Sequence, residues 1–472
     1  MHSYPWLLIA CLSTVPVISA RAVDPAPSST MSPTVRDENL ARVKQMDAAR
    51  MREYGNRPEF LVRPGLLADR PGRIVRVAAE SIRLKPGEPV EFPLVTQGSG
   101  KDYEALAISF ASGMDLHEAL QFIGMAPGRC VDASQLQFWP KGDRVKVVFH
   151  YSAPGTPPVR HDSPVERLII DTRTSKTLPE TGFTFTGSQW KPAQEPATGK
   201  VYAADAFSPG AMVSIYNESF TVLDVPRRVS QSEVYTYQTP NPDYLLPSNQ
   251  VMEVTLEPYF ADNKPHRLDF SLAISPATDS PTNTDLLYSL KGLQNSVINT
   301  NHTVNGLLAA LERLGIPEVF VTVRPNRSTP LAALQKMAKL LNSLDNEKGI
   351  RIEAPPPDEP YFKAFLPNER HRKREDRPAP TAELHLSETS GITTGVLIWV
   401  DSEWKGDDSA PVLHEKRVPA ATPDALSTAI AAKEEAPAVM LVFAPGTLRY
   451  GTLCGFLAPI LKKKMILYVF TE

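Results

Sequence analysis

Cysteine, long apolar runs and an excess of basic charge are all scarce in this 472-residue chain. Three cysteines, with no Cys-x-x-Cys and no Cys/His cluster, argue against a structural zinc or iron–sulfur site. Lys+Arg 50 against Asp+Glu 53 leaves a net charge of −3, so no overall basic field favours a nucleic-acid partner. After the N-terminal region, no run approaches the ~20 apolar residues that a membrane-spanning helix needs. We therefore expect no cofactor, no nucleic acid and no transmembrane segment in the mature chain.

The signatures of common hydrolases are also missing. The sequence contains no Gly-x-Ser-x-Gly, no His-Glu-x-x-His and no phosphate-binding glycine loop, and Gly98-Ser-Gly100 is interpreted as a flexible turn. Proline, at 45 residues, outnumbers glycine, at 25, which favours rigid loops and strand boundaries over long helices. The sequence does not decide whether the protein is an enzyme, but the missing motifs favour a non-catalytic protein.

The first 22 residues have the pattern of a secretion signal. An apolar run from Pro5 to Ser19 precedes Ala20-Arg-Ala22, which fits a small-x-small cleavage site. This pattern predicts an exported protein, periplasmic or secreted, cleaved after Ala22. Leu8-Ile-Ala-Cys11 resembles a lipobox, so a lipid anchor on Cys11 stays open as an alternative.

Cleavage would leave two cysteines, Cys130 and Cys454. They are far apart in sequence and fall in different expected domains. We expect both to be unpaired, while the oxidising compartment of an exported protein leaves a disulfide between them open.

The chain length predicts about three domains at ~150 residues each. Residues 23–73 are expected to contain a tether, up to about residue 40, and a short helix from Glu38 to Tyr54 that packs on the next domain. From Ile74 the apolar period changes to two, and turn signals such as Pro86-Gly87 separate the runs. These features predict a mostly antiparallel, β-rich domain over residues 74–260.

The C-terminal third contains an internal repeat at an offset of 120 residues, from Pro325 to Pro445. A strand, an apolar-periodic helix and a second strand recur: 319–325, 331–341 and 350–352, then 440–445, 451–461 and 465–470. A further helix and a strand are expected upstream in each copy: 304–314 after 268–274, and 423–433 after 394–400. The fold class expected for the whole chain is α+β multidomain, with the β-rich domain followed by two small α/β repeats of ββαβαβ type, over 264–354 and 391–472. Residues 355–390 are expected to be a Pro-rich, charged linker exposed to solvent.

Glu104 and His117 are the candidate site residues, for catalysis or for a metal. Glu104 stands just before an expected strand, and His117 lies in the first turn of the helix after it. Glu104 or Asp102 could orient His117 as a base, or these side chains could bind a metal ion. The competing interpretation is structural, with Asp115 as the N-cap of the helix and Glu118 completing a capping box. Both interpretations stay open.

Other polar and aromatic residues are given structural roles. Asp205 and Asp224 lie in loop and strand-end contexts, where side chains usually bond to the backbone. Four aromatic residues could line a groove, but core packing is the expected role: Trp139, Trp190, Tyr216 and Phe220.

Six short segments carry a resemblance to the YdjY-like domain of bacterial proteins. They are Lys101-Asp-Tyr-Glu-Ala-Leu, Asp115-Leu-His-Glu-Ala-Leu, Phe183-Thr-Phe-Thr-Gly-Ser188, Ala204-Asp205, Val213-Ser-Ile and Leu223-Asp-Val-Pro226. Their order and spacing resemble that family over residues 76–258. Such domains commonly carry His where Tyr103 stands here, which puts in doubt any activity that needs that His. The resemblance implies a fold and an exported location, and no reaction.

Each C-terminal copy resembles the periplasmic domain of ExbD/TolR-type biopolymer-transport proteins, a small α/β fold with helices on one sheet face. Those proteins couple to proton flow through an N-terminal transmembrane helix, which is not expected here, so the energising role is not implied. The resemblance implies a module able to form oligomers or to bind cell-wall or protein ligands. The expected function is therefore an exported, non-catalytic protein that binds protein or cell-envelope partners. The alternative is an envelope enzyme or metal-binding protein with its site around Glu104 and His117.

Overall fold

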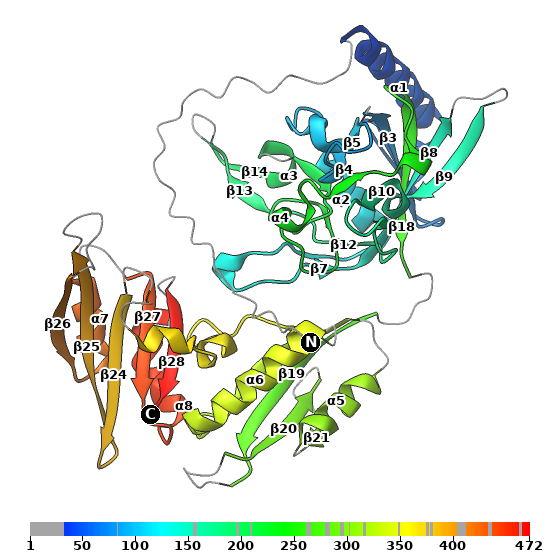
Figure 1. Ribbon diagram of the computed structural model, residues 1–472. Coiled ribbons are helices and arrows are strands. Elements are labelled where there is room, and N and C mark those ends of the chain that lie inside the picture. The colour runs from blue at the N-terminus through cyan, green and yellow to red at the C-terminus, as the bar shows by residue number, and fades with distance from the viewer. Residues whose placement is uncertain are drawn as a thin grey trace.

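The structure is a computed structural model that describes residues 33–472 apart from short gaps. The gaps are residues 83, 154–157, 195–197, 208–209, 261–265, 279–283, 293–296, 302, 315–317, 348–349, 374–376, 378–380, 404–411, 433–436 and 462–464. A β-rich body and two α/β units are visible in Figure 1. The signal sequence, its cleavage site and Cys11 lie outside the described residues.

The β-rich body is built on a closed barrel of eight strands, in the order β3-β18-β8-β12-β16-β15-β4-β5, with β5 pairing back to β3. Its strands are β3 (Ile74–Ser81), β4 (Phe92–Val95), β5 (Ala105–Ser109), β8 (Arg144–Ala153), β12 (Phe183–Phe185), β15 (Ala211–Val213), β16 (Leu223–Asp224) and β18 (Val251–Pro258). The β4–β5 and β15–β16 pairs are parallel and the other neighbours are antiparallel. The expectation of a mostly antiparallel domain agrees with this order. Closure into a barrel was not predicted, because it depends on pairings between distant segments.

The interior of the barrel is a packed apolar core. Side chains alternate along a strand, so every second residue points inward. On neighbouring strands the inward residues share one register, as Val254 does with Val77 and Phe149. The inward residues of β3 and β8 are fully buried: Val75, Val77, Ala79, Val145, Val147 and Phe149. An eight-stranded barrel is just wide enough for such side chains to fill it.

Smaller elements surround the barrel. The strands are β1 (Phe60–Arg63), β2 (Leu66–Asp69), β6 (Pro127–Arg129), β7 (Lys141–Gly142), β9 (Val159–Pro164), β10 (Ile169–Asp171), β11 (Lys176–Thr177), β13 (Trp190–Pro192), β14 (Lys200–Tyr202) and β17 (Gln238–Pro240). The helices are α2 (Gly113–Phe122), α3 (Ala203–Ala206) and α4 (Gln231–Val234), with short 3₁₀ turns η1 (Asp102–Glu104), η2 (Ala133–Gln135), η3 (Val165–Leu168) and η4 (Pro242–Tyr244). The β1–β2 hairpin pairs with β3 and so extends the sheet of this body to residue 60, upstream of the predicted start at 74.

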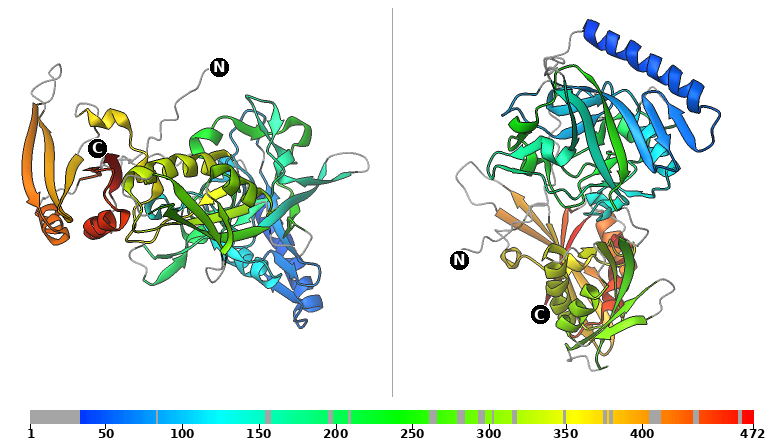
Figure 2. Two further views of the ribbon diagram at one scale, coloured as in Figure 1. Left: turned by 90° about the horizontal axis from the view of Figure 1, so that it is seen from below. Right: turned by 90° about the vertical axis from the view of Figure 1, so that its right-hand side faces the viewer.

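Helix α1 (Pro33–Tyr54) lies along the outside of the barrel (Figure 2). The predicted helix packs on the barrel domain as expected, but mainly through polar groups. Arg36 Nη1 donates to Glu80 Oε2 at 2.8 Å, and Asp47 Oδ2 accepts a bond from the Gly65 N–H at 2.8 Å. Val43 is buried against the barrel, whereas Met51, near the end of the helix, is exposed.

The two α/β units have the same sheet topology. The first sheet has the order β21-β20-β19-β22-β23 and the second β26-β25-β24-β27-β28. In each, the first three strands in chain order are antiparallel neighbours and the last two add in parallel. The first unit contains β19 (Arg267–Pro276), β20 (Leu286–Lys291), β21 (Val297–Asn301), α5 (Val304–Glu312), β22 (Glu318–Pro325), α6 (Leu331–Glu347) and β23 (Ile350–Ile352). The second contains β24 (Thr381–Thr389), β25 (Ile392–Glu403), β26 (Val412–Ala420), α7 (Pro423–Ala431), β27 (Val439–Ala444), α8 (Tyr450–Leu461) and β28 (Ile466–Thr471).

The helices and the strands that follow them lie where the repeat pattern predicted them, but the upstream strands differ. Three strands precede the first helix in each unit, so ββαβαβ undercounts them. The strands predicted at 268–274 and 394–400 are not equivalent, since β19 pairs with β22 whereas β24, not β25, pairs with β27. β24 itself occupies residues assigned to the linker. The edge strands β21 and β26 are of mixed polarity and have little apolar periodicity. β20 and β24 do alternate, with Leu286, Tyr288 and Leu290 buried in one and Ala382, Leu384 and Leu386 in the other, so their signal was present in the sequence and was missed.

The first part of the linker is packed, which corrects the prediction there, whereas the start of its charged run, residues 368–373, is mostly exposed as predicted. Phe362 and Phe365, in the 3₁₀ turn η6 (Phe362–Phe365), are buried in the core of the α/β units. After η7 (Glu369–Arg372), the Arg377 guanidinium donates to the buried Glu383 carboxylate. The charged run is thus partly neutralised inside the fold.

The α/β units contact each other through the loops that precede α6 and α8. The Tyr450 N–H donates to Thr329 O at 2.8 Å, and Pro330 forms an antiparallel bridge with Arg449. At the repeat offset, Thr329 is equivalent to Arg449 and Pro330 to Tyr450. Thr329 therefore contacts the equivalent of Pro330, and Pro330 contacts the equivalent of Thr329. This reciprocal pattern is that of an isologous two-fold interface. Buried side chains of both units form one continuous apolar cluster.

Candidate functional site

Glu104 is half of a buried ion pair. It ends η1, directly before β5, and its Oε1 accepts a bond from Lys101 Nζ at 2.6 Å. Lys101 Nζ also donates to Tyr103 OH at 3.1 Å. Burial opposes the charge on Lys101, but the hydrogen bonds to Glu104 and Tyr103 outweigh it and raise the pKa of Lys101. The Glu104 carboxylate is therefore committed to a neighbouring lysine.

Two more carboxyls lie in the same region. Glu91 is fully buried, and its two oxygens accept bonds from Gln231 Nε2 at 3.0 and 2.9 Å. Burial raises the pKa of Glu91, and the charge of Glu104 adds to that effect. Burial also raises the pKa of Glu218, which accepts a bond from Tyr216 OH at 3.3 Å. Within the described residues, no three His, Cys, Asp or Glu side chains come together in a group that could hold a metal ion.

His117 has a defined orientation on α2. Its Nδ1 lies 2.9 Å from Gly187 O and 3.0 Å from Tyr202 OH, and Tyr202 OH donates to Gly187 O at 2.9 Å. A carbonyl oxygen can only accept, so a proton on Nδ1 satisfies this arrangement best. The lone pair of the neutral ring then resides on Nε2. His117 Nε2 is the atom that a proton or a ligand would reach.

Glu104 and His117 have separate partners. Glu104 bonds to Lys101, whereas His117 bonds to Gly187 and Tyr202. Among the hydrogen bonds of the described residues, none joins the two side chains. The structure therefore does not show the base-and-orienter pair that sequence reasoning considered.

The cap of α2 differs from the prediction. Ser112 is the N-cap and accepts a bond from the Asp115 N–H at 3.0 Å, while Ser112 Oγ donates to Asp115 Oδ2 at 2.7 Å. Asp115 is thus the third residue of the helix, and Glu118 instead forms an ion pair with Arg63 at 3.2 Å. Ser112 and Asp115 can both cap a helix, so the sequence alone did not determine which of them is the N-cap.

Asp205 and Asp224 have different surroundings. Asp205 accepts bonds from the Gly113 N–H at 2.6 Å and the Met114 N–H at 3.0 Å, so it holds the first turn of α2 as the sequence predicted for a side-chain-to-backbone role. Asp224 is fully buried on β16, where its Oδ1 accepts a bond from Asn217 Nδ2 at 3.2 Å. Burial raises the pKa of Asp224 well above its ordinary value.

Gly187 allows the His117 ring to approach the backbone. Its φ is +79°, and a Cβ there would lie 2.8 Å from Pro127 Cβ and 3.0 Å from His117 Cε1. Gly187→Ala is expected to lower the free energy of unfolding, measured by urea unfolding followed by circular dichroism, by about 2–3 kcal/mol through left-handed strain and overpacking. Gly199→Ala, at φ +93° with open space around it, is the control and should cost only about 1 kcal/mol. Equal losses for both variants would contradict a packing role at Gly187.

Aromatic side chains extend from His117 to the surface. The Tyr202 ring lies 5.7 Å from the His117 ring and 5.6 Å from Trp190, centroid to centroid. Trp190 is exposed, so the predicted core role is wrong for it, whereas Tyr216 is buried as predicted. Phe220 is partly buried beneath Lys191, whose Nζ is 5.7 Å from the ring centroid.

Cys130 and Cys454 are separate free thiols. Both are buried, and burial raises the pKa of Cys130 to about 12 and that of Cys454 to about 11. A protonated, buried thiol is unreactive. The disulfide that the sequence left open is not formed.

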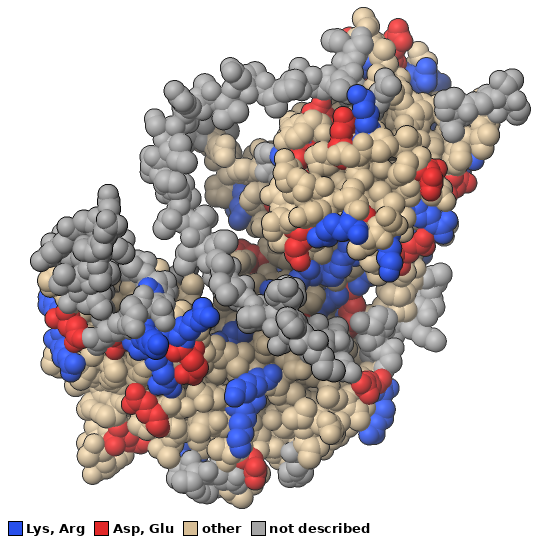
Figure 3. Space-filling view, in the orientation of Figure 1, with Lys and Arg blue, Asp and Glu red and all other residues tan. Residues whose placement is uncertain are grey.

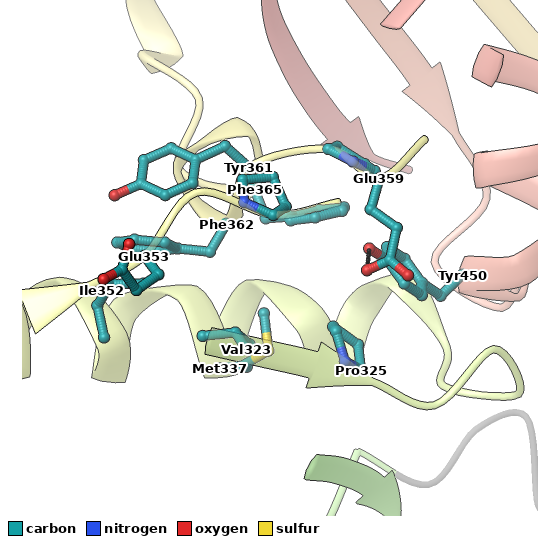
Figure 4. Close-up of a pocket in the computed structure, with 12 residues that line it drawn as sticks. Val323, Pro325, Met337, Ile352, Glu353, Glu359, Tyr361, Phe362, Phe365 and Tyr450 are labelled. Atoms are coloured by element: carbon teal, nitrogen blue, oxygen red, sulfur yellow. Dashed lines mark hydrogen bonds between the residues drawn. The ribbon is translucent and has the colours of Figure 1, made fainter. Parts of the chain in front are cut away.

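A small cavity lies where α6, the linker and Tyr450 meet (Figure 4). Val323, Pro325 and Met337 form its apolar floor, and Tyr450 OH donates to Glu359 Oε2 at 3.1 Å at one end. Its volume of about 20 Å³ accommodates about one water molecule. The cavity is a gap at a joint between segments, too small for an organic ligand.

A buried charge network joins the barrel to the first α/β unit, where Lys and Arg side chains gather between the two bodies (Figure 3). Glu318, at the start of β22, accepts a bond from Arg144 Nε of β8 at 2.8 Å and pairs with Arg351 Nη1 of β23 at 3.0 Å. Arg351 Nη2 donates to Pro226 O at 2.6 Å. The Arg351 guanidinium carbon lies 5.2 Å from the ring centroids of both Trp139 and Phe320, one from each body.

A second set of contacts extends this interface. Asp345, buried in α6, accepts a bond from Trp139 Nε1 at 3.0 Å, so Trp139 serves the interface rather than a groove. Glu353 pairs with Arg129 at 2.5 Å and with Lys141 at 3.1 Å. Sequence reasoning missed these residues because their partners lie in distant segments. The available signal was a charge inside an apolar strand, as in Ile350-Arg-Ile352.

Comparisons with known proteins do not identify the chain: no protein-family model matches it, and a search of curated proteins finds no relative. Among the helices of the described residues, none combines the length and the apolar character needed to cross a membrane.

Proposed function

We propose that this protein is an exported, non-catalytic, multidomain protein that binds protein or cell-envelope partners. In this proposal a YdjY-like barrel is followed by two α/β repeats that resemble ExbD/TolR periplasmic domains. The observation that carries the proposal is the buried network around Glu318, through which Arg144 of the barrel and Arg351 of the first unit hold the two bodies together. These buried ion pairs hold the barrel and the first α/β unit in one relative position. A scaffold that presents surfaces to partners needs its domains held in this way.

The contact between the α/β units supports the same proposal. Because the Thr329–Tyr450 and Pro330–Arg449 contacts are two-fold related, the repeats satisfy within one chain the interface that a dimeric module would form between two chains. The pair then acts as one rigid unit with its outer sheet edges available.

The alternative function, an envelope enzyme or metal-binding protein, is favoured by one observation: the His117 ring is oriented with Nε2 as its basic atom. His117 would then act as a base or as a metal ligand, and Glu104 would contribute only through its ion pair with Lys101.

Metal analysis of the purified full-length protein separates the two functions. We expect less than one equivalent of zinc or other transition metal per chain, and no change in metal content or circular dichroism in His117→Ala. In parallel, the tagged protein should retrieve the same envelope component from independent extracts. A stoichiometric metal that His117→Ala loses while the fold is kept would replace the binding proposal with the metal-dependent alternative.

A further inference from the structure

The two α/β units have edge strands of opposite character at the same place in their sheets. β21 is the edge of the first sheet and β26 the edge of the second. β26 carries His414-Glu-Lys-Arg417 and Pro419, and charges and proline are the devices that keep edge strands from pairing with other chains. β21 reads Val297-Ile-Asn-Thr-Asn301 and has neither charge nor proline.

Apolar side chains are exposed along β21. Val297 is 60 % and Ile298 50 % exposed, and Val304, the first residue of the adjacent α5, is 37 % exposed. Figure 1 shows β21 and α5 together on the side of the first unit. The pairing with β20 shifts between Leu290 and Lys291, which leaves Ile298 without a cross-strand partner. Such a bulge re-aims side chains and accounts for two consecutive apolar residues that both reach solvent.

The unpaired backbone of β21 determines the conformation of a segment that binds there. One side of the strand bonds to β20, and in the described part of the chain no strand pairs with the other side. Free N–H and C=O groups along an edge are satisfied by another extended strand. The occupant must therefore be extended where it binds.

The size of the edge indicates a flexible segment rather than a second copy of the chain. Five residues of strand are roughly 17 Å long. An edge of that length buries far less than the roughly 800 Å² per partner of a stable protein–protein interface. A second rigid copy would gain too little from this edge alone. A flexible segment can add its backbone to β21 and also cover Val304 on α5.

We propose that the β21 edge binds an extended, uncharged segment of a protein partner by strand addition, with apolar residues that cover Val297, Ile298 and Val304. The inference rests on the proposed partner-binding function and names the kind of partner. The absence of charge on β21 favours a neutral segment, because a charged residue that covered Val297 and Ile298 would lose hydration and find no counter-charge on β21 itself. The charged residue that pairs with this strand is Lys291 of β20, opposite Val297.

The test uses a fluorescent peptide with the sequence of β21 itself, Val-Ile-Asn-Thr-Asn, as the strand-addition probe. Fluorescence anisotropy with the full-length protein should show saturable binding. Ile298→Lys should weaken it at least tenfold, since a charge on the edge opposes strand pairing. Ile392→Lys is the matched control: Ile392 is 67 % exposed on β25, which is bordered by β24 and β26, and its substitution should leave binding unchanged.

Three results would overturn the proposal. The first is no binding by the wild-type protein, and the second is an equal affinity for wild type and Ile298→Lys. The third is a wild-type dimer in sedimentation that Ile298→Lys dissociates, which would make a second copy the occupant. Capture of envelope components by the tagged protein distinguishes a failure of the β21 site from a failure of the proposed binding function. A partner retained by Ile298→Lys refutes only the β21 site, whereas wild-type protein that captures no partner refutes the binding function itself.

Discussion

Glu318→Ala should lower the free energy of unfolding by about 3–5 kcal/mol, because it leaves Arg144 and Arg351 buried without their counter-charge. Both arginines come from strands that also build the cores of their bodies, β8 and β23, so the loss acts on the joint between the barrel and the first α/β unit. Urea unfolding followed by circular dichroism measures the loss. Limited proteolysis should detect faster cleavage between residues 258 and 267, where the chain passes from one body to the other.

Two comparisons make the Glu318 prediction specific. Glu257→Ala removes a partner of Lys146 from an ion pair that is partly exposed on the barrel, and should cost less than about 1 kcal/mol. The triple change Glu318→Leu, Arg144→Met, Arg351→Met removes all three charges and should recover much of the stability, as buried ion clusters often tolerate apolar replacement. A loss for Glu318→Ala no larger than that for Glu257→Ala would show that the network does not hold the bodies together.

Asp224→Asn should flatten the pH dependence of stability. Asp224 is fully buried, and burial raises the pKa of its carboxyl well above the ordinary value. The native state therefore keeps a proton that the unfolded chain releases, so stability is highest below the ordinary carboxyl pKa of about 4 and falls as the pH rises toward the raised native pKa. One such group contributes a slope of up to about 1.4 kcal/mol per pH unit in that window.

The surroundings of Asp224 explain why the neutral form fits. Among the described residues, Asp224 Oδ2 and Thr184 Oγ1 have no hydrogen-bond partner, and the two residues are cross-strand neighbours on β16 and β12. The charged form of Asp224 would be buried there with neither a cation nor a hydrogen bond to Oδ2, so burial favours the neutral carboxyl. Glu91, with its pKa raised by burial, should add a slope of the same sign.

Urea unfolding at several values from about pH 4.5 to 8.5 measures the slope. Asp162→Asn is the opposite control, because the hydrogen bond to His150 lowers the pKa of the Asp162 carboxyl. Its contribution is fully present above the ordinary carboxyl pKa of about 4 and is lost only as the pH falls through the lowered one, so Asp162→Asn should leave the slope from about pH 4.5 to 8.5 unchanged. If Asp224→Asn kept the full wild-type slope, Asp224 would not be the group responsible.

Local pattern predicted the helices of the repeats because their apolar positions recur with helical spacing within one segment. Leu334 and Cys454, equivalent at the repeat offset, are both buried on their helices. The candidate site was less predictable. Ser112 and Asp115 both have capping side chains, and only the backbone position of the first turn decides between them. The sequence named His117 as a candidate, but its partners Gly187 and Tyr202 lie in segments that no local pattern connects to it.

The sequence by itself determined the strand-rich first body, the repeated α/β units and the absence of a long apolar span after residue 22, because each follows from periodicity or composition within short windows. Only the tertiary structure decided which strands close the barrel, where the linker packs and what Glu318, Arg351 and Asp345 contact. Those outcomes depend on long-range pairings, and the position of a charge in sequence does not reveal whether burial will bring it a counter-charge. The same limit applies to β21: its sequence shows a neutral strand, and only its place at the sheet edge leaves Val297 and Ile298 exposed.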